Sequence, residues 1–250
     1  MGSELAGKVA LVTGASKGIG KAIAAAYAAE GAAVMLSSRR QDGLDAAADE
    51  IVAATPDAVL STFAANAGEE DQAAACVEAT IERLGALDVL VANAATNPYY
   101  GATIDTDLGA WDKTFRVNLR GVFAWAQLAW RSWMAEHGGR MIFVSSVGGI
   151  NPAGAIGAYD VTKAGTIHLA KVLAAELAPD VTVNCIAPGL VQTDFARALW
   201  EQLGDAGRAR LAQPEDIAAA AVYLAGPGGA RVSGTTLVVD AGGLVSGTLV

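Results

Sequence analysis

The sequence predicts an α/β protein: a single Rossmann-type doubly wound parallel sheet of about seven strands, with helices on both faces. Apolar runs of strand length alternate with helical stretches along the 250 residues, and a glycine-rich turn follows the first run. Neither a linker, an internal repeat nor a low-complexity segment interrupts this alternation. We therefore expect one dinucleotide-binding catalytic domain over residues 1–250.

The expected elements follow one another in regular order. Strands are expected near residues 8–12, 33–37, 58–63, 87–92, 140–145, 181–186 and 235–239, and helices over 18–30, 42–54, 69–84, 111–136, 158–178 and 214–225. Short apolar runs that alternate with longer helical patterns predict strand–helix–strand units, which build a parallel sheet covered on both faces.

The first unit carries the glycine-rich turn. The strand that ends at Val12 is followed by TGASKGIG over residues 13–20 and then by an alanine-rich helical stretch. Gly14 permits a tight turn, Gly18 lets the main chain approach phosphates, and Gly20 lets the helix pack closely on the strand. A flexible surface turn is the alternative, but the strand–turn–helix context favours binding of a dinucleotide pyrophosphate.

A tyrosine and a lysine lie one helical turn apart further along the chain. Tyr159 and Lys163 are four residues apart in the helix expected over 158–178, and Ser146 lies thirteen residues before Tyr159. We expect the ammonium to lower the pKa of the phenol from its ordinary value near ~10. Such a phenol exchanges a proton near neutral pH, as alcohol–carbonyl interconversion requires. The alternatives are an exposed amphipathic pair and a serine that merely ends a strand.

Together these motifs resemble the short-chain dehydrogenase/reductase family. In that family's order, the chain carries TGASKGIG, Asn93-Ala94-Ala95, Asn118, Ser146, Tyr159-x-x-x-Lys163 and Pro188-Gly189. The resemblance runs from Lys8 to about Gly243, and the segments 95–99 and 188–195 are most similar to the carbonyl reductase/retinol dehydrogenase branch. It implies an oxidoreductase that acts on CH–OH donors.

The resemblance also implies a role for each expected catalytic residue. Tyr159 exchanges a proton with the substrate oxygen, and Ser146 donates a hydrogen bond to that oxygen. Lys163 holds the nicotinamide ribose in addition to acting on Tyr159. Asn118 resembles the residue that holds a water for proton relay to Lys163. A helix-bending polar residue is the alternative reading of Asn118.

The charges after the second strand favour NADP(H) over NAD(H). An acidic residue usually binds the ribose hydroxyls of NAD there, whereas this chain has Ser38-Arg39-Arg40 and no carboxylate before Asp42. These arginines and Lys17 of the glycine turn are expected to converge on a 2′-phosphate, which an arginine can bind with two donors. A solvated basic turn is the alternative.

By resemblance, Asn66 faces the adenine and Thr193 contacts the nicotinamide amide, while Ala92-Asn93-Ala94-Ala95 departs from the family's usual Asn-Asn-Ala-Gly. The expected cofactor residues are Gly14, Ser16, Lys17, Gly18, Ile19, Gly20, Ser38, Arg39, Arg40, Asn66, Asn93, Ala94, Tyr159, Lys163, Pro188, Gly189, Val191 and Thr193.

Composition restricts the remaining classes of protein. A formal net charge of −9 disfavours nucleic acid and anionic membranes as partners. Cys76 and Cys185 suggest reduced thiols rather than a disulfide framework, and the N-terminus has no signal-peptide pattern, so we expect a cytoplasmic protein. His137 and His168 have no partner at metal-ligand spacing, so no metal site is expected.

The substrate is expected to be a hydrophobic ketone or aldehyde. The candidate pocket walls are the loop after Ser146, the segment 96–100 and the stretch after Pro188, and all three are mostly apolar or aromatic. Two alternatives stay open: a 3-oxoacyl-carrier-protein reductase and a non-catalytic nucleotide sensor. By resemblance we also expect a homo-oligomer, a tetramer or a dimer.

Overall fold

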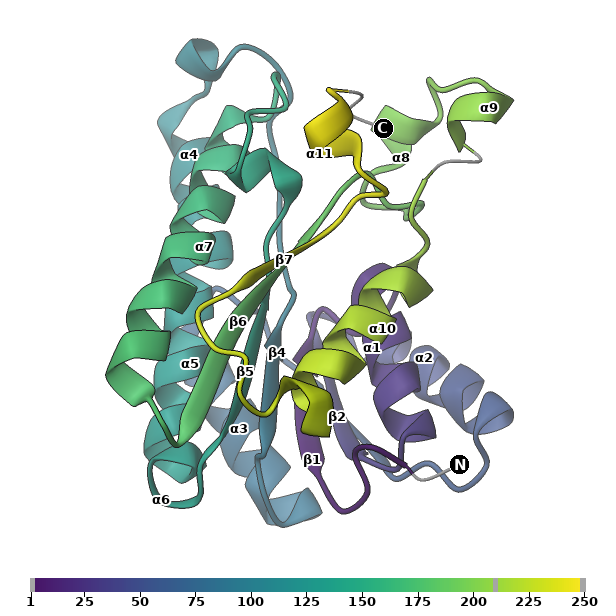
Figure 1. Ribbon diagram of the computed structural model, residues 1–250, viewed down its shortest axis with the longest axis vertical. Helices are drawn as coiled ribbons and strands as arrows, with labels where there is room; N and C mark the ends of the chain where they lie inside the picture. Colours follow the sequence, from purple (N-terminus) through teal and green to yellow (C-terminus); the bar gives the residue numbers. More distant parts are fainter. Residues whose placement is uncertain (1–2, 209–210, 248–250) are drawn as a thin grey trace.

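The computed structural model describes residues 3–208 and 211–247 and contains a seven-stranded sheet in the order β3-β2-β1-β4-β5-β6-β7 (Figure 1). The strands are β1 (Val9–Thr13), β2 (Ala33–Ser38), β3 (Leu60–Ala64), β4 (Val89–Ala92), β5 (Gly139–Val144), β6 (Val181–Pro188) and β7 (Thr236–Val239). Every neighbouring pair is parallel. The predicted Rossmann-type sheet is therefore confirmed.

Eleven α-helical segments are described. They are α1 (Gly18–Ala29), α2 (Gln41–Ala54), α3 (Glu70–Leu84), α4 (Leu108–Phe115), α5 (Val122–Ala129), α6 (Ala135–His137), α7 (Gly157–Leu177), α8 (Arg197–Trp200), α9 (Asp205–Arg208), α10 (Pro214–Ala225) and α11 (Gly243–Ser246). The helix expected over 111–136 is helical from 108 to 137, but two π-helical segments, Arg116–Gly121 and Trp130–Met134, separate α4, α5 and α6. Within the described ranges, no helix combines the length and the apolar character needed to cross a bilayer.

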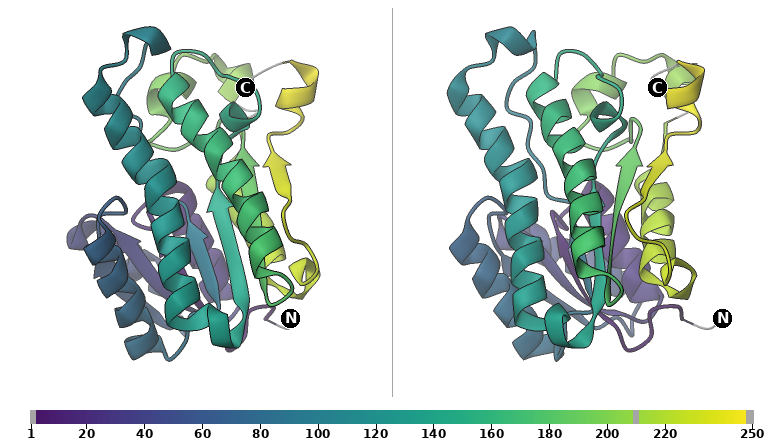
Figure 2. Two further views of the ribbon diagram at one scale, coloured as in Figure 1. Left: turned by 90° about the vertical axis from the view of Figure 1, so that its left-hand side faces the viewer. Right: turned by 60° about the vertical axis from the view of Figure 1, so that its left-hand side comes forward.

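The helices cover both faces of the sheet, as Figures 1 and 2 show. One hydrophobic cluster joins the sheet to α1, α2 and α10, and a second joins the opposite face to α3, α5 and α7. Side chains alternate between the two clusters along each strand: Leu11 lies in the second cluster, whereas Ala10 and Val12 lie in the first. This alternation explains why the strands read as continuous apolar runs.

The strand order reverses between β1 and β4, and this reversal positions the candidate site. β2 and β3 lie on one side of β1, and β4 to β7 follow on the other. Where the order reverses, the connections leave in opposite directions and open a crevice beyond the carboxyl ends of the strands. In Figure 1, α8, α9 and α11 gather at that same end of the sheet.

A buried tyrosine ties α1 to α10 on the first face. The side chain of Tyr27 is completely buried, and its hydroxyl donates a hydrogen bond to the carbonyl oxygen of Ala221 at 3.1 Å. A buried polar group stabilises a protein only while its partner is present, because a lone donor or acceptor in the core loses its bond to water. The pair therefore contributes both packing and orientation to the two helices.

We expect Tyr27→Phe to lower the free energy of unfolding by about 1 kcal/mol, because the carbonyl of Ala221 loses its buried partner. In a domain of this size the loss corresponds to a melting temperature lower by roughly 2–4 °C. Tyr223→Phe, which changes a partly exposed tyrosine on α10, is the matched control. Equal melting temperatures for the two variants would contradict the prediction.

Candidate active site

The carboxyl end of β1 leads directly into the glycine turn that begins α1. Gly14 has a φ of 68°, a conformation that a side chain disfavours. A Cβ at position 20 would overlap the carbonyl oxygen of Gly14, so α1 packs on the turn only with glycine there. The unpaired N–H groups and the dipole of the helix favour an anionic group at its N-terminus. This cradle fits the pyrophosphate that the sequence analysis expects.

Thr13 and Asn93 join the ends of β1 and β4 beside this turn. The Thr13 hydroxyl accepts hydrogen bonds from the main-chain N–H groups of Asn93 and Ala94 at 3.0 and 3.1 Å. The Asn93 amide donates to the Thr13 carbonyl oxygen at 2.9 Å. Thr13 was not among the predicted site residues, although a threonine between an apolar strand and a glycine turn is a signal visible in the sequence. These bonds fix the floor of the crevice.

The expected cofactor residues all lie along this edge of the sheet. The glycine turn and the start of α1 contain residues 14–20, and Ser38 ends β2 and is followed by Arg39 and Arg40. Asn66 follows β3, and Asn93 and Ala94 follow β4. Helix α7 carries Tyr159 and Lys163, and the end of β6 and the segment after it carry Pro188, Gly189, Val191 and Thr193.

Three of the four expected catalytic residues meet between the end of β5 and the first turns of α7. Ser146 lies two residues after β5. Its hydroxyl accepts a hydrogen bond from the main-chain N–H of Gly148 at 3.1 Å, and it lies near enough to the Tyr159 phenol to lower the pKa of that phenol. The Lys163 ammonium lies 5.3 Å from the centroid of the Tyr159 ring. A hydroxyl, a phenol and an ammonium therefore share one small region at the crevice.

Lys163 places its ammonium in the interior of the molecule. The residue is 2% exposed, and its Nζ donates a hydrogen bond to the carbonyl oxygen of Val144 at 2.7 Å. The Ser145 hydroxyl donates to the main-chain carbonyl of Lys163 at 2.8 Å and fixes the helix against the end of β5. Burial lowers the pKa of Lys163 to about 8, because desolvation disfavours the charged form.

The pKa of Tyr159 is raised in this structure, not lowered as the sequence predicted. Burial raises the pKa of Tyr159, the hydrogen bond with Ser146 lowers it, and the charge of neighbouring Asp160 raises it further, so the net direction is upward. The prediction of a lowered pKa is therefore wrong. The sequence showed the spacing of the two residues, but it did not show that residues from other elements partly bury the Tyr159 side chain.

Asn118, the fourth expected catalytic residue, lies in the first π-helical segment and is completely buried. Its side-chain oxygen accepts from the Thr96 N–H at 2.8 Å, and its amide donates to the Thr96 carbonyl at 2.9 Å. The Asn118 main-chain carbonyl accepts the Thr166 hydroxyl at 3.2 Å. Both polar atoms of the Asn118 side chain are bonded to the main chain of Thr96. A water that relays a proton to Lys163 would therefore have to bind the Asn118 main-chain carbonyl. Single π turns inside helices occur frequently at functional sites.

The three cations expected to converge on a 2′-phosphate do not converge in this structure. Lys17 forms an ion pair with Asp194 at 3.4 Å, and Arg40 forms one with Asp42 at 3.4 Å. Arg39 is exposed and has neither a hydrogen bond nor an ion pair within the described part of the chain. Of these three cationic side chains, Arg39 is therefore the one most available to bind an anion.

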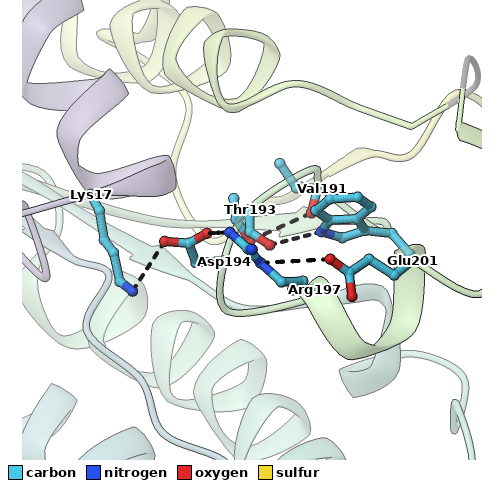
Figure 3. A network of polar contacts seen from close by, with 7 residues as sticks. Lys17, Val191, Thr193, Asp194, Arg197 and Glu201 are labelled. Carbon is cyan, nitrogen blue, oxygen red and sulfur yellow. Dashed lines mark hydrogen bonds and ion pairs between the residues drawn. The ribbon is translucent and has the colours of Figure 1, made fainter.

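A polar network joins the glycine turn to the segment after β6 (Figure 3). The Asp194 carboxylate pairs with both Lys17 and Arg197, and these two partners lower its pKa. The indole N–H of Trp200 donates to the carbonyl oxygen of Thr193 at 2.8 Å. Asp194 could not be identified from the sequence alone, because its partner Lys17 is 177 residues away in the chain. The network connects the two walls of the crevice.

Asn66 and the histidines have local roles here. The Asn66 side-chain oxygen accepts from the Gly68 N–H at 3.2 Å, so its amide group stays available.

The His137 ring stacks on Trp133, while His168 lies exposed on α7. Over residues 3–208 and 211–247, no three His, Cys, Asp or Glu side chains form a group that could hold a metal ion.

Comparisons with known proteins identify the family of the chain. A family model described as enoyl-(acyl carrier protein) reductase matches residues 14–243. The human protein named dehydrogenase/reductase SDR family member 4 is 36% identical over 248 residues, which cover 95% of this chain and 88% of the human protein.

Two solved structures share the whole fold. Levodione reductase superposes with a TM-score of 0.91 at 29% identity, covering 97% of this chain and 99% of that one. An actinorhodin polyketide ketoreductase variant solved with NADPH has a TM-score of 0.87 at 31% identity, covering 97% and 98%.

The fold and the crevice thus define an oxidoreductase of the dinucleotide-binding type. Within that class, the chain belongs to the short-chain dehydrogenase/reductase family, as the sequence motifs predicted.

The pKa of Lys163 leads to a prediction about stability. An unfolded lysine has a pKa near ~10.4, whereas the folded value is about 8. Between these values the unfolded chain binds more protons than the folded chain, so stability rises with pH in that window. Relative to Lys163→Met, the wild-type free energy of unfolding should therefore rise by on the order of 3 kcal/mol from pH 7.5 to 10.5.

Denaturant unfolding at several pH values measures this difference. Lys171→Met changes an exposed lysine on the same helix, and its difference from wild type should stay constant over the same range. A constant difference for Lys163→Met as well would show that the buried ammonium keeps its proton throughout.

Proposed function

We propose that this chain is an NADPH-dependent carbonyl reductase, which reduces a hydrophobic ketone or aldehyde to its alcohol and catalyses the reverse reaction. The observation that carries the proposal is the meeting of Ser146, Tyr159 and Lys163 beside the crevice at the strand-order reversal. The glycine turn that begins α1 supplies the anion cradle on the other side of that crevice.

Ser146 and Tyr159 would act on the substrate oxygen. A bound nicotinamide would supply hydride to the carbonyl carbon. Ser146 would donate a hydrogen bond to the oxygen as negative charge develops there. Tyr159 would supply the proton, and its raised pKa keeps the phenol protonated at neutral pH, ready to act as an acid.

Lys163 and Asn118 would support that proton transfer. The Lys163 ammonium is fixed by Val144 and lies near the Tyr159 ring, so its charge would stabilise the phenolate left after the proton departs. A lysine with a pKa of about 8 can give up and regain a proton near neutral pH. The Asn118 main-chain carbonyl, which also accepts the Thr166 hydroxyl, would bind a water for returning that proton.

The preference for NADPH is proposed from the residues after β2. Ser38 and Arg39 take the place where NAD-dependent folds usually carry a carboxylate, and Arg39 has its donors free within the described residues. A guanidinium suits a phosphate because it offers two parallel donors. The NADPH named with the polyketide ketoreductase structure agrees with this choice.

A hydrophobic substrate is supported by the side chains around Tyr159. The Phe195 ring centroid lies 6.0 Å from that of Tyr159, and Phe195 is 56% exposed. Ile150, in the segment after Ser146, is also substantially exposed. An apolar group bound between these side chains would remove apolar surface from water, which favours binding.

A second candidate is a reductase of carrier-bound acyl groups, because the matching family model carries that description. Carrier proteins are acidic, and a chain with a formal net charge of −9 would repel them unless a local basic patch faced the crevice. A simple β-ketothioester, included among the test substrates, distinguishes this candidate from the first. Cytoplasmic location and assembly as a homotetramer or dimer belong to the same proposal.

Tyr159→Phe tests the proposed role of the phenol. NADPH consumption with a panel of cyclic and aryl ketones should fall by roughly 10²–10⁴-fold, because the proton donor is lost. The dissociation constant for NADPH, measured by fluorescence, should change little. Tyr223→Phe on α10 is the control and should keep full activity. Turnover that persists in Tyr159→Phe would exclude Tyr159 as the acid, and no turnover by wild type with any ketone would favour a nucleotide sensor.

Arg39→Ser tests the cofactor preference. Loss of charge-assisted bonds to a 2′-phosphate should weaken NADPH binding about tenfold, which corresponds to ~1.4 kcal/mol, and leave NADH binding unchanged. Arg231→Ser removes an exposed arginine beyond α10 and serves as the control for net charge. Equal weakening of both cofactors by Arg39→Ser would remove Arg39 from a phosphate-binding role.

A further inference from the structure

Asp160 is a buried carboxylate directly after Tyr159 on α7. It is 5% exposed, and one side-chain oxygen, Oδ2, accepts a hydrogen bond from the main-chain N–H of Ala153 at 2.9 Å. The other oxygen, Oδ1, is inaccessible to solvent and has no hydrogen-bond partner in the described part of the chain. A half-satisfied buried carboxylate costs free energy, so its presence calls for a physical reason.

Ordinary helix capping does not explain the buried carboxylate, because its hydrogen-bond partner, Ala153, lies outside the helix. A carboxylate in the first turn of a helix usually accepts from N–H groups of that turn or interacts with the helix dipole. Ala153 lies four residues before the start of α7 at Gly157. The hydrogen bond therefore fixes the segment between Ser146 and α7 rather than the end of the helix.

Asp160 contacts that segment, residues 147–156, at two places. Oδ2 binds Ala153 in its second half, while Oδ1 packs against Gly148 near its start, where a Cβ would overlap Oδ1. The Gly148 N–H in turn donates to the Ser146 hydroxyl at 3.1 Å. One side chain therefore connects the middle of the segment to the residue pair that would act on the substrate oxygen.

The first half of the segment is held by a 3-10 turn over Val147–Gly149, whereas the second half, from residue 151 to 156, has little other support. Residues 151–154 are all exposed, and Ala155 has a φ of 55°, a left-handed conformation that costs an alanine free energy. Beyond Asp160, the second half is held by a main-chain bond from Gly101 to the Ala155 carbonyl at 2.8 Å. An exposed segment with a strained residue keeps one shape only when its ties hold it.

We propose that Asp160 is a positioning residue for the substrate. It holds residues 147–156 as a fixed wall of the substrate pocket, in a constant position relative to Ser146 and Tyr159. This inference rests on the proposed reductase function, because the wall contains Ile150, part of the apolar surface proposed above to bind the ketone. The effect of Asp160 reaches the reaction through Ala153 and Gly148.

Two substitutions at position 160 separate this role from general stability. Asp160→Ala removes the acceptor for the Ala153 N–H, whereas Asp160→Asn keeps an acceptor oxygen of the same size and removes the charge. Asp160→Ala should raise KM for the ketone about tenfold, as expected for one lost hydrogen bond of ~1.4 kcal/mol, with a smaller fall in kcat and unchanged affinity for NADPH. Asp160→Asn should restore KM to near the wild-type value.

Hydrogen exchange provides a readout that needs no turnover. The peptide containing Ala153 should exchange faster in Asp160→Ala than in wild type or Asp160→Asn, while peptides from the sheet should not change. Glu176→Gln, which alters an exposed carboxylate on the same helix, is the control. Melting temperatures confirm that each variant is folded.

The outcomes are distinct. Unchanged KM in folded Asp160→Ala, unchanged exchange at Ala153, or an Asp160→Asn protein as impaired as Asp160→Ala would each overturn the positioning role. Absence of turnover by wild type would instead overturn the proposed reductase function, and the exchange measurement would still decide whether Asp160 holds the segment.

Discussion

A buried positive charge determines how this site is arranged. The ammonium of Lys163 lies out of reach of water, and the carbonyl oxygen of Val144 at the end of β5 supplies its hydrogen bond at 2.7 Å. Desolvating an ammonium is costly, so α7 is held where this acceptor can be reached. Tyr159, one helical turn earlier, and Ser146, two residues after Val144, are thereby brought together. The geometry of three side chains follows from one hydrogen bond to the edge of the sheet.

Most of the fold could be predicted because its causes are local. Buried parallel strands require continuous apolar runs, and the predicted strand near 181–186 lies within β6, Val181–Pro188. The glycine turn needs particular conformations at particular residues, so its motif is visible in the sequence. The π-helical segment around Asn118 could not be predicted, because one wider turn barely alters the apolar pattern of a helix. The short helices after β6 lack a periodic pattern long enough to detect.

The site was only partly predictable for a different reason. The motif placed Tyr159 and Lys163 one turn apart, but the pKa of the phenol depends on burial by residues from other elements, and burial raises it in this structure. Likewise, the sequence predicted that Lys17 would bind a phosphate, whereas in the structure Lys17 forms an ion pair with Asp194. Asp160 looked like an ordinary helix residue, and only the tertiary structure shows its carboxylate buried against Ala153 and Gly148.

The ion pairs of Asp194 with Lys17 and Arg197 have a consequence for how fast a coenzyme can be exchanged. All three side chains are largely exposed, and dissolved ions screen attractions between exposed charges. Nucleotide entry or departure past the glycine turn would require these charges to separate. The proposed hydride and proton steps would occur beside a desolvated lysine that such screening hardly reaches. Ionic strength should therefore change the lifetime of the nucleotide complex far more than the rate of the bond-making steps within it.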